Sequence, residues 1–493
     1  MPTTNLKDKA AKGFFWSALN NGLMQVLNAV FGIVLALKLN QADYGLIGML
    51  TVFSLIAKSL QDSGFVTALT NKRDATHRDY NSVFWFNIAV SACLYIILYA
   101  CAPLVSAFYD EPILTGLSRY YFIGFFIASF SIVPRAILFR QIKQKELAVM
   151  GLAALMVSGT VGITMAYCGM AYWGLATQTI TFNLMVSVLS WIISRWRPSK
   201  DVSMVPIKEM FGFSSKMLIT NIFNQINNNI FSLLLGKFYT KVEVGTYTQA
   251  NKWNTMGSST ITGMVQGVAQ PTFVQVGEDK GRLCHTFSKM LRFTCFVSFP
   301  VMFGLSLVAP EFIIVLIKDK WLPSAYLMRI LCIGGAFLPI ATLYFNLIIS
   351  RGKSNVYMWN VISQGCTILA TTMLIYRLWK GCTFSLLGID INNIDMMVIA
   401  YVAIIIIWTG IWHYFLYREI RYPFISAVKD IAPFMIIAAG TMAATYLITL
   451  GISNVYLLLI TRIAIAAAIY LSAMKLANVK IMKECVGYIL HKK

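Results

Sequence analysis

Long apolar runs recur from one end of the chain to the other. A run of roughly twenty apolar residues crosses the hydrocarbon core of a bilayer as an α-helix. The pattern predicts fourteen such helices, at residues 14–37, 45–69, 83–107, 116–137, 147–168, 171–194, 209–236, 245–270, 290–310, 326–350, 356–379, 394–417, 432–450 and 455–475. The predicted fold is therefore an all-α polytopic membrane protein.

The first and seventh predicted helices resemble each other at positions 200 residues apart. The shared residues are Asn21, Gln25, Asn28, Phe31, Leu35 and Gly45, which recur as Asn221, Gln225, Asn228, Phe231, Leu235 and Gly245. Six spans separate the two helices, so both begin on the same side, which indicates parallel repeats about an axis along the membrane normal. We expect six-helix bundles at 1–200 and 201–418, followed by two additional helices and a cytoplasmic tail at 419–493.

Composition and charge agree with this topology. Of the 493 residues, 58% are hydrophobic and only 12% are charged, which excludes an ordinary soluble domain. The predicted loops on the side of the two termini hold 27 Lys and Arg, against 7 on the opposite side. Positive residues are retained in the cytoplasm, so both termini are expected there. The formal charge of +21 is thereby explained as a topology signal, and no nucleic-acid partner is expected.

Amide side chains form a stripe on each of the two related helices. Asn21, Gln25 and Asn28 share one helical face. The second stripe consists of Asn221, Gln225, Asn228 and Ser232, and Asn224 and Asn227 widen it. An amide that faced lipid would lack hydrogen-bond partners. Two interpretations stay open: the stripes line a hydrated central cavity that takes the substrate, or they pair across a helix–helix interface.

Charged residues also fall inside predicted spans. Lys58 precedes Asp62 by one turn, and the two either form a self-contained ion pair or present a cation to a translocation cavity. Asp62 is the one acid expected deep in a span. Lys216, Lys252 and Arg462 lie about 10 Å inside their helices, at 1.5 Å per residue. Each of these three is expected to reach toward the membrane interface, although Lys216 and Lys252 remain candidates for the cavity.

Motifs for catalysis or for cofactors are missing from the sequence. It contains no HExxH, no GxSxG and no complete phosphate loop. The nine cysteines form no CxxC pair and the four histidines are dispersed, so neither a metal nor any other cofactor is expected. No predicted loop exceeds about twenty residues, which leaves no room for a soluble catalytic domain. These features argue against an enzyme.

Several short motifs carry a resemblance to a known family. They are Gln61-Asp62-Ser63-Gly64-Phe65, Asn81 with Phe84-Trp85-Phe86-Asn87, Phe139-Arg140, Gln270-Pro271-Thr272-Phe273, Gly277-Glu278-Asp279-Lys280 and Arg351-Gly352-Lys353. Together they resemble Wzx-type oligosaccharide flippases of the multidrug/oligosaccharidyl-lipid/polysaccharide exporter superfamily, near the colanic-acid and teichuronic-acid exporters. The resemblance covers nearly the whole chain, although each motif alone is loose.

The resemblance implies a flippase of the bacterial cytoplasmic (inner) membrane. The implied substrate is an oligosaccharide on polyprenyl diphosphate, moved to the outer leaflet by alternating access for surface polysaccharide synthesis. Membrane lipid and the polymerase and glycosyltransferases of the same pathway are the implied partners. Two other hypotheses stay open: a small-molecule or multidrug cation exporter of the same superfamily, and a membrane enzyme such as a polysaccharide polymerase.

Overall fold

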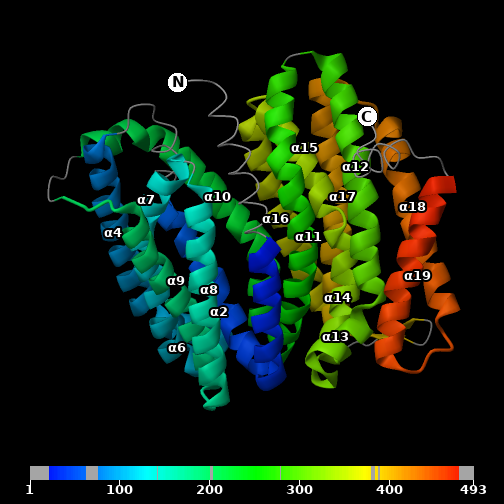
Figure 1. The fold of residues 1–493 in the computed structure, drawn as a ribbon, viewed down its shortest axis with the longest axis horizontal. Helices are drawn as coiled ribbons and strands as arrows, with labels where there is room; N and C mark the ends of the chain where they lie inside the picture. Colours follow the sequence, from blue (N-terminus) through cyan, green and yellow to red (C-terminus); the bar gives the residue numbers. More distant parts are fainter. Residues whose placement is uncertain are drawn as a thin grey trace. The chain divides into compact units, whose positions relative to one another are not determined.

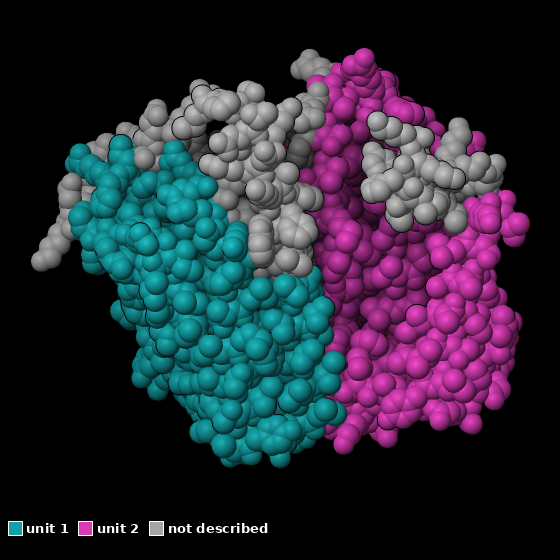
Figure 2. Space-filling view, viewed as in Figure 1, with its two compact units in different colours: residues 1–245 teal, residues 246–493 magenta. Residues whose placement is uncertain are grey.

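The computed structural model describes residues 22–62, 76–141, 143–199, 204–277, 279–378, 384–386 and 389–476. Nearly all of these residues are helical (Figure 1). The exception is a small antiparallel hairpin of β1 (Phe384–Leu386) and β2 (Ile389–Ile391), in which Phe384 pairs with Ile391. The chain divides into two compact units, residues 1–245 and 246–493 (Figure 2).

Eleven of the described helical segments are long and apolar enough to cross a membrane. They are Gln41–Gln61, His77–Ala100, Ile113–Arg140, Lys145–Tyr167, Ala171–Ser194, Lys280–Leu307, Asp319–Ser350, Asn355–Leu378, Asn393–Ile420, Phe424–Ile448 and Val455–Leu476. Each overlaps one of the spans predicted from the apolar runs. The prediction of a helical, multi-pass membrane protein is therefore confirmed.

The first unit begins with the helical residues 22–38. The helices that follow are α2 (Gln41–Asp62), α4 (His77–Ala100), α5 (Ala102–Tyr109), α6 (Ile113–Tyr121), α7 (Ile123–Arg140), α8 (Gln144–Tyr167), α9 (Ala171–Ser194) and α10 (Val205–Phe238). Within this unit α9 packs along α7 and α8, and α2 packs along α10.

The second unit contains most of α11 (Lys241–Val276), whose first five residues belong to the first unit. The remaining helices are α12 (Lys280–Leu307), α13 (Ala309–Ile317), the 3-10 turn η1 (Asp319–Trp321), α14 (Leu322–Gly335), α15 (Leu338–Ser350), α16 (Ser354–Leu378), α17 (Asn393–Ile420), α18 (Phe424–Ile448) and α19 (Val455–Leu476). Here α12 packs on α18, and α18 packs on α19.

Among the predicted spans that are broken into two helices, two illustrate how proline restarts a helix. The span predicted at 83–107 ends as α4 at Ala100 and resumes as α5, which carries Pro103 in its first turn. The span predicted at 326–350 breaks between α14 and α15, and Pro339 again lies in the first turn of the second helix. Proline has no backbone N–H and fits best in a first helical turn, so the chain restarts its helix there.

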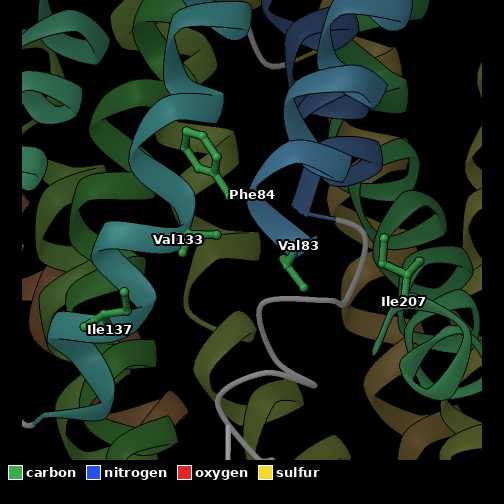
Figure 3. Close-up of a cluster of buried hydrophobic side chains, with 5 residues drawn as sticks. All are labelled: Val83, Phe84, Val133, Ile137 and Ile207. Atoms are coloured by element: carbon green, nitrogen blue, oxygen red, sulfur yellow. The ribbon is translucent and has the colours of Figure 1, made fainter. Parts of the chain in front are cut away.

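An apolar cluster joins the beginning of α4 to α7 and α10 in the first unit. Figure 3 shows Val83 and Phe84 on α4, Val133 and Ile137 on α7, and Ile207 on α10. The ring of Phe84 also makes edge-on contacts with those of Trp85, Trp191 and Trp196. Such aromatic pairs contribute about 0.5–1.5 kcal/mol each beyond the area they bury.

The same end of α4 holds the segment that follows α9. The backbone N–H of Ser199 donates to Asn81 Oδ1 at 2.8 Å, and the indole N–H of Trp85 donates to the carbonyl of Ser199 at 2.8 Å. Asn81 is fully buried. The motif residues Asn81 and Phe84-Trp85 therefore fix the chain between the sixth and seventh predicted spans onto the first unit.

A buried carboxylate ties α18 to α12 in the second unit. Asp430 accepts hydrogen bonds from the hydroxyls of Ser288 and Tyr422, and from Arg292 Nε at 2.6 Å. Burial, and then the hydrogen bond to Asp430, raise the pKa of the Tyr422 phenol, which lies between α17 and α18. Tyr422 therefore remains a donor to this carboxylate at physiological pH.

A second buried ion pair fixes α19. Arg462 on α19 lies 2.7 Å from Glu311 on α13, measured from Nη1 to Oε1, and its Nε donates to Thr449 Oγ1 at 3.1 Å. Only 4% of Arg462 is exposed, so the expectation that this arginine reaches toward the interface is wrong. Glu311 and Asp430 are two further acids that are buried within helices, and neither was singled out from the sequence.

Candidate functional site

The first amide stripe lies on the helical residues 22–38. Asn28 is exposed, and Gln25 is half-buried and engaged in an interaction, whereas Asn21 lies outside the described residues. Farther along the same face, Phe31 and Leu35 are buried. Phe31 packs on α8 with ring atoms 2.6 Å from the place that a Cβ on Gly159 would occupy. Within the first unit, this helical face is therefore covered by neighbouring residues at Phe31 and Leu35 and is exposed at Asn28.

The second stripe lies on α10 and follows the same order. Asn221 and Gln225 are half-buried, and Asn229 Nδ2 donates to the backbone carbonyl of Gln225 at 2.9 Å. Phe231 and Leu235, the counterparts of Phe31 and Leu35, are buried. The side chains of Asn224, Asn228 and Lys216 lie outside the described part of α10.

Lys58 on α2 is a predicted cationic residue of the site. Its side chain is exposed and makes no ion pair or hydrogen bond with any side chain that the structure describes. Asp62 is the last residue of α2, and its side chain lies outside the described set. Between them Gln61 is buried, and its Nε2 donates to Ser91 Oγ at 2.8 Å and to the carbonyl of Phe125 at 3.2 Å. These bonds fix the end of α2 that carries Lys58 to α4 and α7.

Lys252 belongs to the second unit, on α11. It is half-buried, and its Nζ lies 5.8 Å from the centroid of the adjacent Trp253 ring. A cation over an aromatic face gains roughly 0.5–2 kcal/mol, depending on how far it is desolvated. Lys252 therefore remains a candidate for the substrate cavity. Its contact with the Trp253 ring was not predicted from the sequence.

Two buried amides were not predicted as candidates. Asn87 on α4 and Gln249 on α11 are both fully buried, and neither the donor nor the acceptor of either amide has a hydrogen-bond partner among the described residues. Leaving a buried polar group unpaired costs about 1–3 kcal/mol. Only weak features of the sequence point to these two amides. Asn87 is the last residue of the Phe84–Asn87 motif, and Gln249 is one more amide in the polar stretch that follows α10.

The described candidate residues of the first unit therefore combine neutral amides with an exposed lysine, Lys58. Amides donate and accept hydrogen bonds, which suits the hydroxyl groups of sugars, and an ammonium group suits phosphate oxygens. Neither kind of group supplies a nucleophile or a general base at neutral pH. The chemistry available here is binding.

The family model described as "Polysaccharide biosynthesis protein" matches residues 34–326. Among curated proteins, the teichuronic acid biosynthesis protein TuaB of Bacillus subtilis (strain 168) is 25% identical over 79% of this chain and 82% of its own length. The lipopolysaccharide biosynthesis protein WzxC of Escherichia coli (strain K12) is 21% identical over 72% of this chain and 73% of its own.

Solved structures show the same fold at low sequence identity. The lipid II flippase MurJ, in an inward closed conformation, has a TM-score of 0.70 at 14% identity and covers 98% of this chain and 99% of its own. An inward-facing multidrug resistance transporter of the MATE family has a TM-score of 0.59 at 12% identity, over 87% of this chain and 99% of its own. The fold is thus that of the superfamily predicted from the motifs. Since the family model matches more than half of the sequence, the chain belongs to the family of polysaccharide biosynthesis proteins.

Proposed function

We propose that this protein is a flippase that moves polyprenyl-diphosphate-linked oligosaccharide from the cytoplasmic to the outer leaflet by alternating access. The observation that carries the proposal is Lys58, an exposed lysine on an apolar membrane helix with no described ion-pair partner. A lysine facing lipid costs roughly 2.5–3.5 kcal/mol or more. That cost disappears when the exposed side chain faces a hydrated route, where it attracts a passing anion.

The substrate's chemistry fits the candidate residues. A diphosphate must cross a layer of low dielectric constant, and a cation with hydrogen-bond donors lowers that barrier. Lys58, Lys216 and Lys252 are the proposed cations, and Asp62 is proposed to orient Lys58. The amides proposed to line the route and bind sugar hydroxyls are Asn21, Gln25, Asn28, Asn221, Asn224, Gln225 and Asn228. The prenyl chain is proposed to remain in lipid beside the protein.

We propose fourteen spans in two parallel six-helix repeats, 1–200 and 201–418, followed by the helix pair at 419–493. Besides the eleven apolar helices, the helical residues 22–38 together with α10 and α11 supply the remaining three. These three carry the amide-rich segments, which lowers their hydropathy. We further propose that the protein lies in a bacterial inner membrane with both termini in the cytoplasm, and the bias of positive residues supports this orientation.

The proposed partners follow from this activity. They are the lipid-linked oligosaccharide, the surrounding membrane lipid, and the glycosyltransferases and polymerase that act before and after the flipping step. No cofactor and no chemical step on the substrate are proposed, because the candidate residues bind but do not react.

Deleting the gene tests the activity directly. We expect the lipid-linked repeat unit to accumulate on the cytoplasmic leaflet and the surface polysaccharide to disappear. Mass spectrometry of extracted lipids identifies the trapped glycan, and a glycosidase added to right-side-out vesicles reports its leaflet. Normal surface polysaccharide in the deletion strain would refute the proposal.

The amide stripe provides a second prediction. Replacing Gln25 and Asn28 together by leucine should lower export about five- to a hundredfold, because each of the two lost hydrogen bonds is worth about 0.5–1.5 kcal/mol. The matched control is Val26→Leu, since Val26 is an exposed apolar residue on the same helix. Surface polysaccharide is measured per unit of protein in the membrane. Export equal to that of the control would assign the stripe to helix–helix contact.

The cation-exporter alternative is less well supported. A site for cationic compounds needs carboxylates that are free to bind them. Among the described residues of the second unit, the buried acids Glu311 and Asp430 are instead paired with Arg462 and Arg292. A drug-resistance assay on the deletion strain separates the two hypotheses, and unchanged resistance is expected.

A further inference from the structure

The packing of α12 on α18 orients one arginine at the surface of the second unit. The buried carboxylate of Asp430 accepts from the hydroxyls of Ser288 and Tyr422, and from Arg292 Nε at 2.6 Å. The Arg292 side chain is nevertheless 48% exposed. A guanidinium holds five N–H donors in a fixed planar fork. Because the described contact with Asp430 uses Nε, the carboxylate fixes the fork and leaves its Nη donors available to a ligand.

The two helices run in the same direction where they pack. Ser288 on α12 contacts Asp430 on α18, and farther along both helices the ring of Phe296 lies 6.3 Å from that of Phe434. All of these residues belong to the second unit. The parallel direction decides which neighbouring side chains share one side of the helix pair.

Lys429 shares a side of this pair with Arg292. Successive side chains turn by about 100° around an α-helix. In parallel helices, the residue after Ser288 and the residue before Asp430 therefore turn toward the same side. Arg292, one turn after Ser288, leans that way, and so does Lys429. The two cations come from different helices and are brought together by the contact at Asp430.

Lys429 is placed where a cation needs an anion. It lies five residues, or about 7 Å, inside the apolar helix Phe424–Ile448. Its side chain is exposed and forms no ion pair or hydrogen bond with any residue that the structure describes. A lysine that faces lipid chains is unfavourable unless it reaches a polar group.

Apolar side chains surround the two cations. Phe293, next to Arg292, is 45% exposed, and Ile425, one turn before Lys429, is 69% exposed. Val428 is also exposed. Such a surface suits a ligand with an anionic head and apolar chains, because each part then meets its own kind of group.

We propose that Arg292 and Lys429 form a binding site for the phosphodiester headgroup of an anionic membrane phospholipid, separate from the transported substrate. Asp430, with Ser288 and Tyr422, acts as the positioning group that aims Arg292. The inference uses the proposed topology only for the leaflet, which is the cytoplasmic one.

The charge of the site favours a phosphodiester over the diphosphate of the proposed substrate. Arg292 and Lys429 each carry one positive charge and Asp430 carries one negative charge, which leaves one net positive charge. Lys289, which is also exposed on α12, is already engaged in another interaction. A phosphodiester carries one negative charge and offers two free oxygens, which matches one guanidinium edge and one ammonium group.

The test measures lipid binding to purified protein in a non-ionic detergent. Phosphatidylglycerol should raise the apparent melting temperature by about 5 °C, because a ligand that binds the folded state stabilises it. In Lys429→Ala, the concentration that gives half of this shift should rise about tenfold, since a charge-assisted hydrogen bond is lost. The absence of any shift in the parent protein would refute the site.

Arg292→Lys distinguishes an aimed fork from general positive charge. The variant keeps the cation and its pairing with Asp430, so the fold is preserved. A lysine has one ammonium group, which the carboxylate occupies, and therefore no outward edge remains for the lipid. The half-effect concentration should again rise about tenfold. Binding equal to that of the parent protein would overturn the role of the guanidinium.

Lys353→Ala is the matched control. Lys353 is an exposed lysine of the second unit on the same predicted side of the membrane, without a described ion pair. Its removal should leave the lipid effect unchanged. An equal weakening in Lys353→Ala and Lys429→Ala would replace the site by a diffuse attraction between a basic face and an anionic surface.

Three other ligands identify the occupant. Inorganic phosphate and phosphatidylcholine should each give less than about a third of the shift, because one lacks the chains and the other lacks the net charge. A polyprenyl diphosphate should not displace phosphatidylglycerol. Equal stabilisation by either of the first two, or displacement by the third, would overturn the assignment. The readout is binding, so a deletion strain with normal polysaccharide would reject the flippase and leave this site intact.

Discussion

Replacing Lys58 by alanine is expected to lower polysaccharide export by about tenfold or more, with an unchanged amount of protein in the membrane. A hydrogen bond to a charged group is worth roughly 1.5–3 kcal/mol, and about 1.4 kcal/mol corresponds to a factor of ten. Lys58 has no described partner whose loss would destabilise the fold. The effect should therefore fall on transport, and it is measured as surface polysaccharide per flippase molecule.

Two further variants separate charge from shape. Lys58→Arg keeps the cation and should retain most of the export. Lys475→Ala makes the same substitution at an exposed lysine in the last turn of α19 and should have no effect. If Lys58→Ala exports normally, the lysine does not act on the substrate.

The largest effect on stability is expected at the Glu311–Arg462 pair. Arg462→Met leaves Glu311 buried without a counter-charge, which costs about 3–5 kcal/mol. The apparent melting temperature in detergent should fall by about 10 °C. Size-exclusion chromatography after stepwise heating measures the loss of monodisperse protein.

The double variant Glu311→Leu/Arg462→Met is the decisive comparison. Replacing both members of a buried pair by apolar residues is often neutral or stabilising, whereas removing one is not. The double variant should therefore recover most of the lost melting temperature. Equal losses in the single and double variants would show that Arg462 acts through packing and its bond to Thr449 rather than through the charge pair.

The apolar runs predicted where helices lie, but not where they begin and end. Asp279 caps α12, which starts at Lys280, although the predicted span starts at residue 290. The polar first two turns of this helix lie before its apolar part, so hydropathy alone misses them. The breaks at Cys101 and Ala336 were missed because the apolar pattern continues across each of them.

The buried ion pairs were missed for a related reason. Glu311 lies one residue beyond the span predicted at 290–310, and Asp430 lies two residues before the span predicted at 432–450. Both acids were therefore assigned to loops. Their partners are distant in sequence, so spacing rules for one helix do not find them.

The family prediction rested on motifs and is confirmed by the match over residues 34–326. Some of the motif residues have a structural role in the fold. Gln61 forms a hydrogen bond with a neighbouring helix, and Asn81 and Trp85 form hydrogen bonds with the segment after α9. The amides and lysines of the proposed route remain predictions, because a single sequence places them on faces but does not show what they contact.

The pairing of Glu311 with Arg462 also bears on how the protein is made. Arg462 is synthesised 151 residues after Glu311. At about 5–20 residues per second, Glu311 waits roughly 8–30 s for its counter-charge. Arg462 lies in the second turn of α19. Insertion of this helix into the membrane is favoured once α13 is in place, because Glu311 on α13 then supplies the counter-charge. The last hairpin therefore completes the second unit late in biogenesis, and a chain truncated before α19 should be recognised and degraded as incomplete.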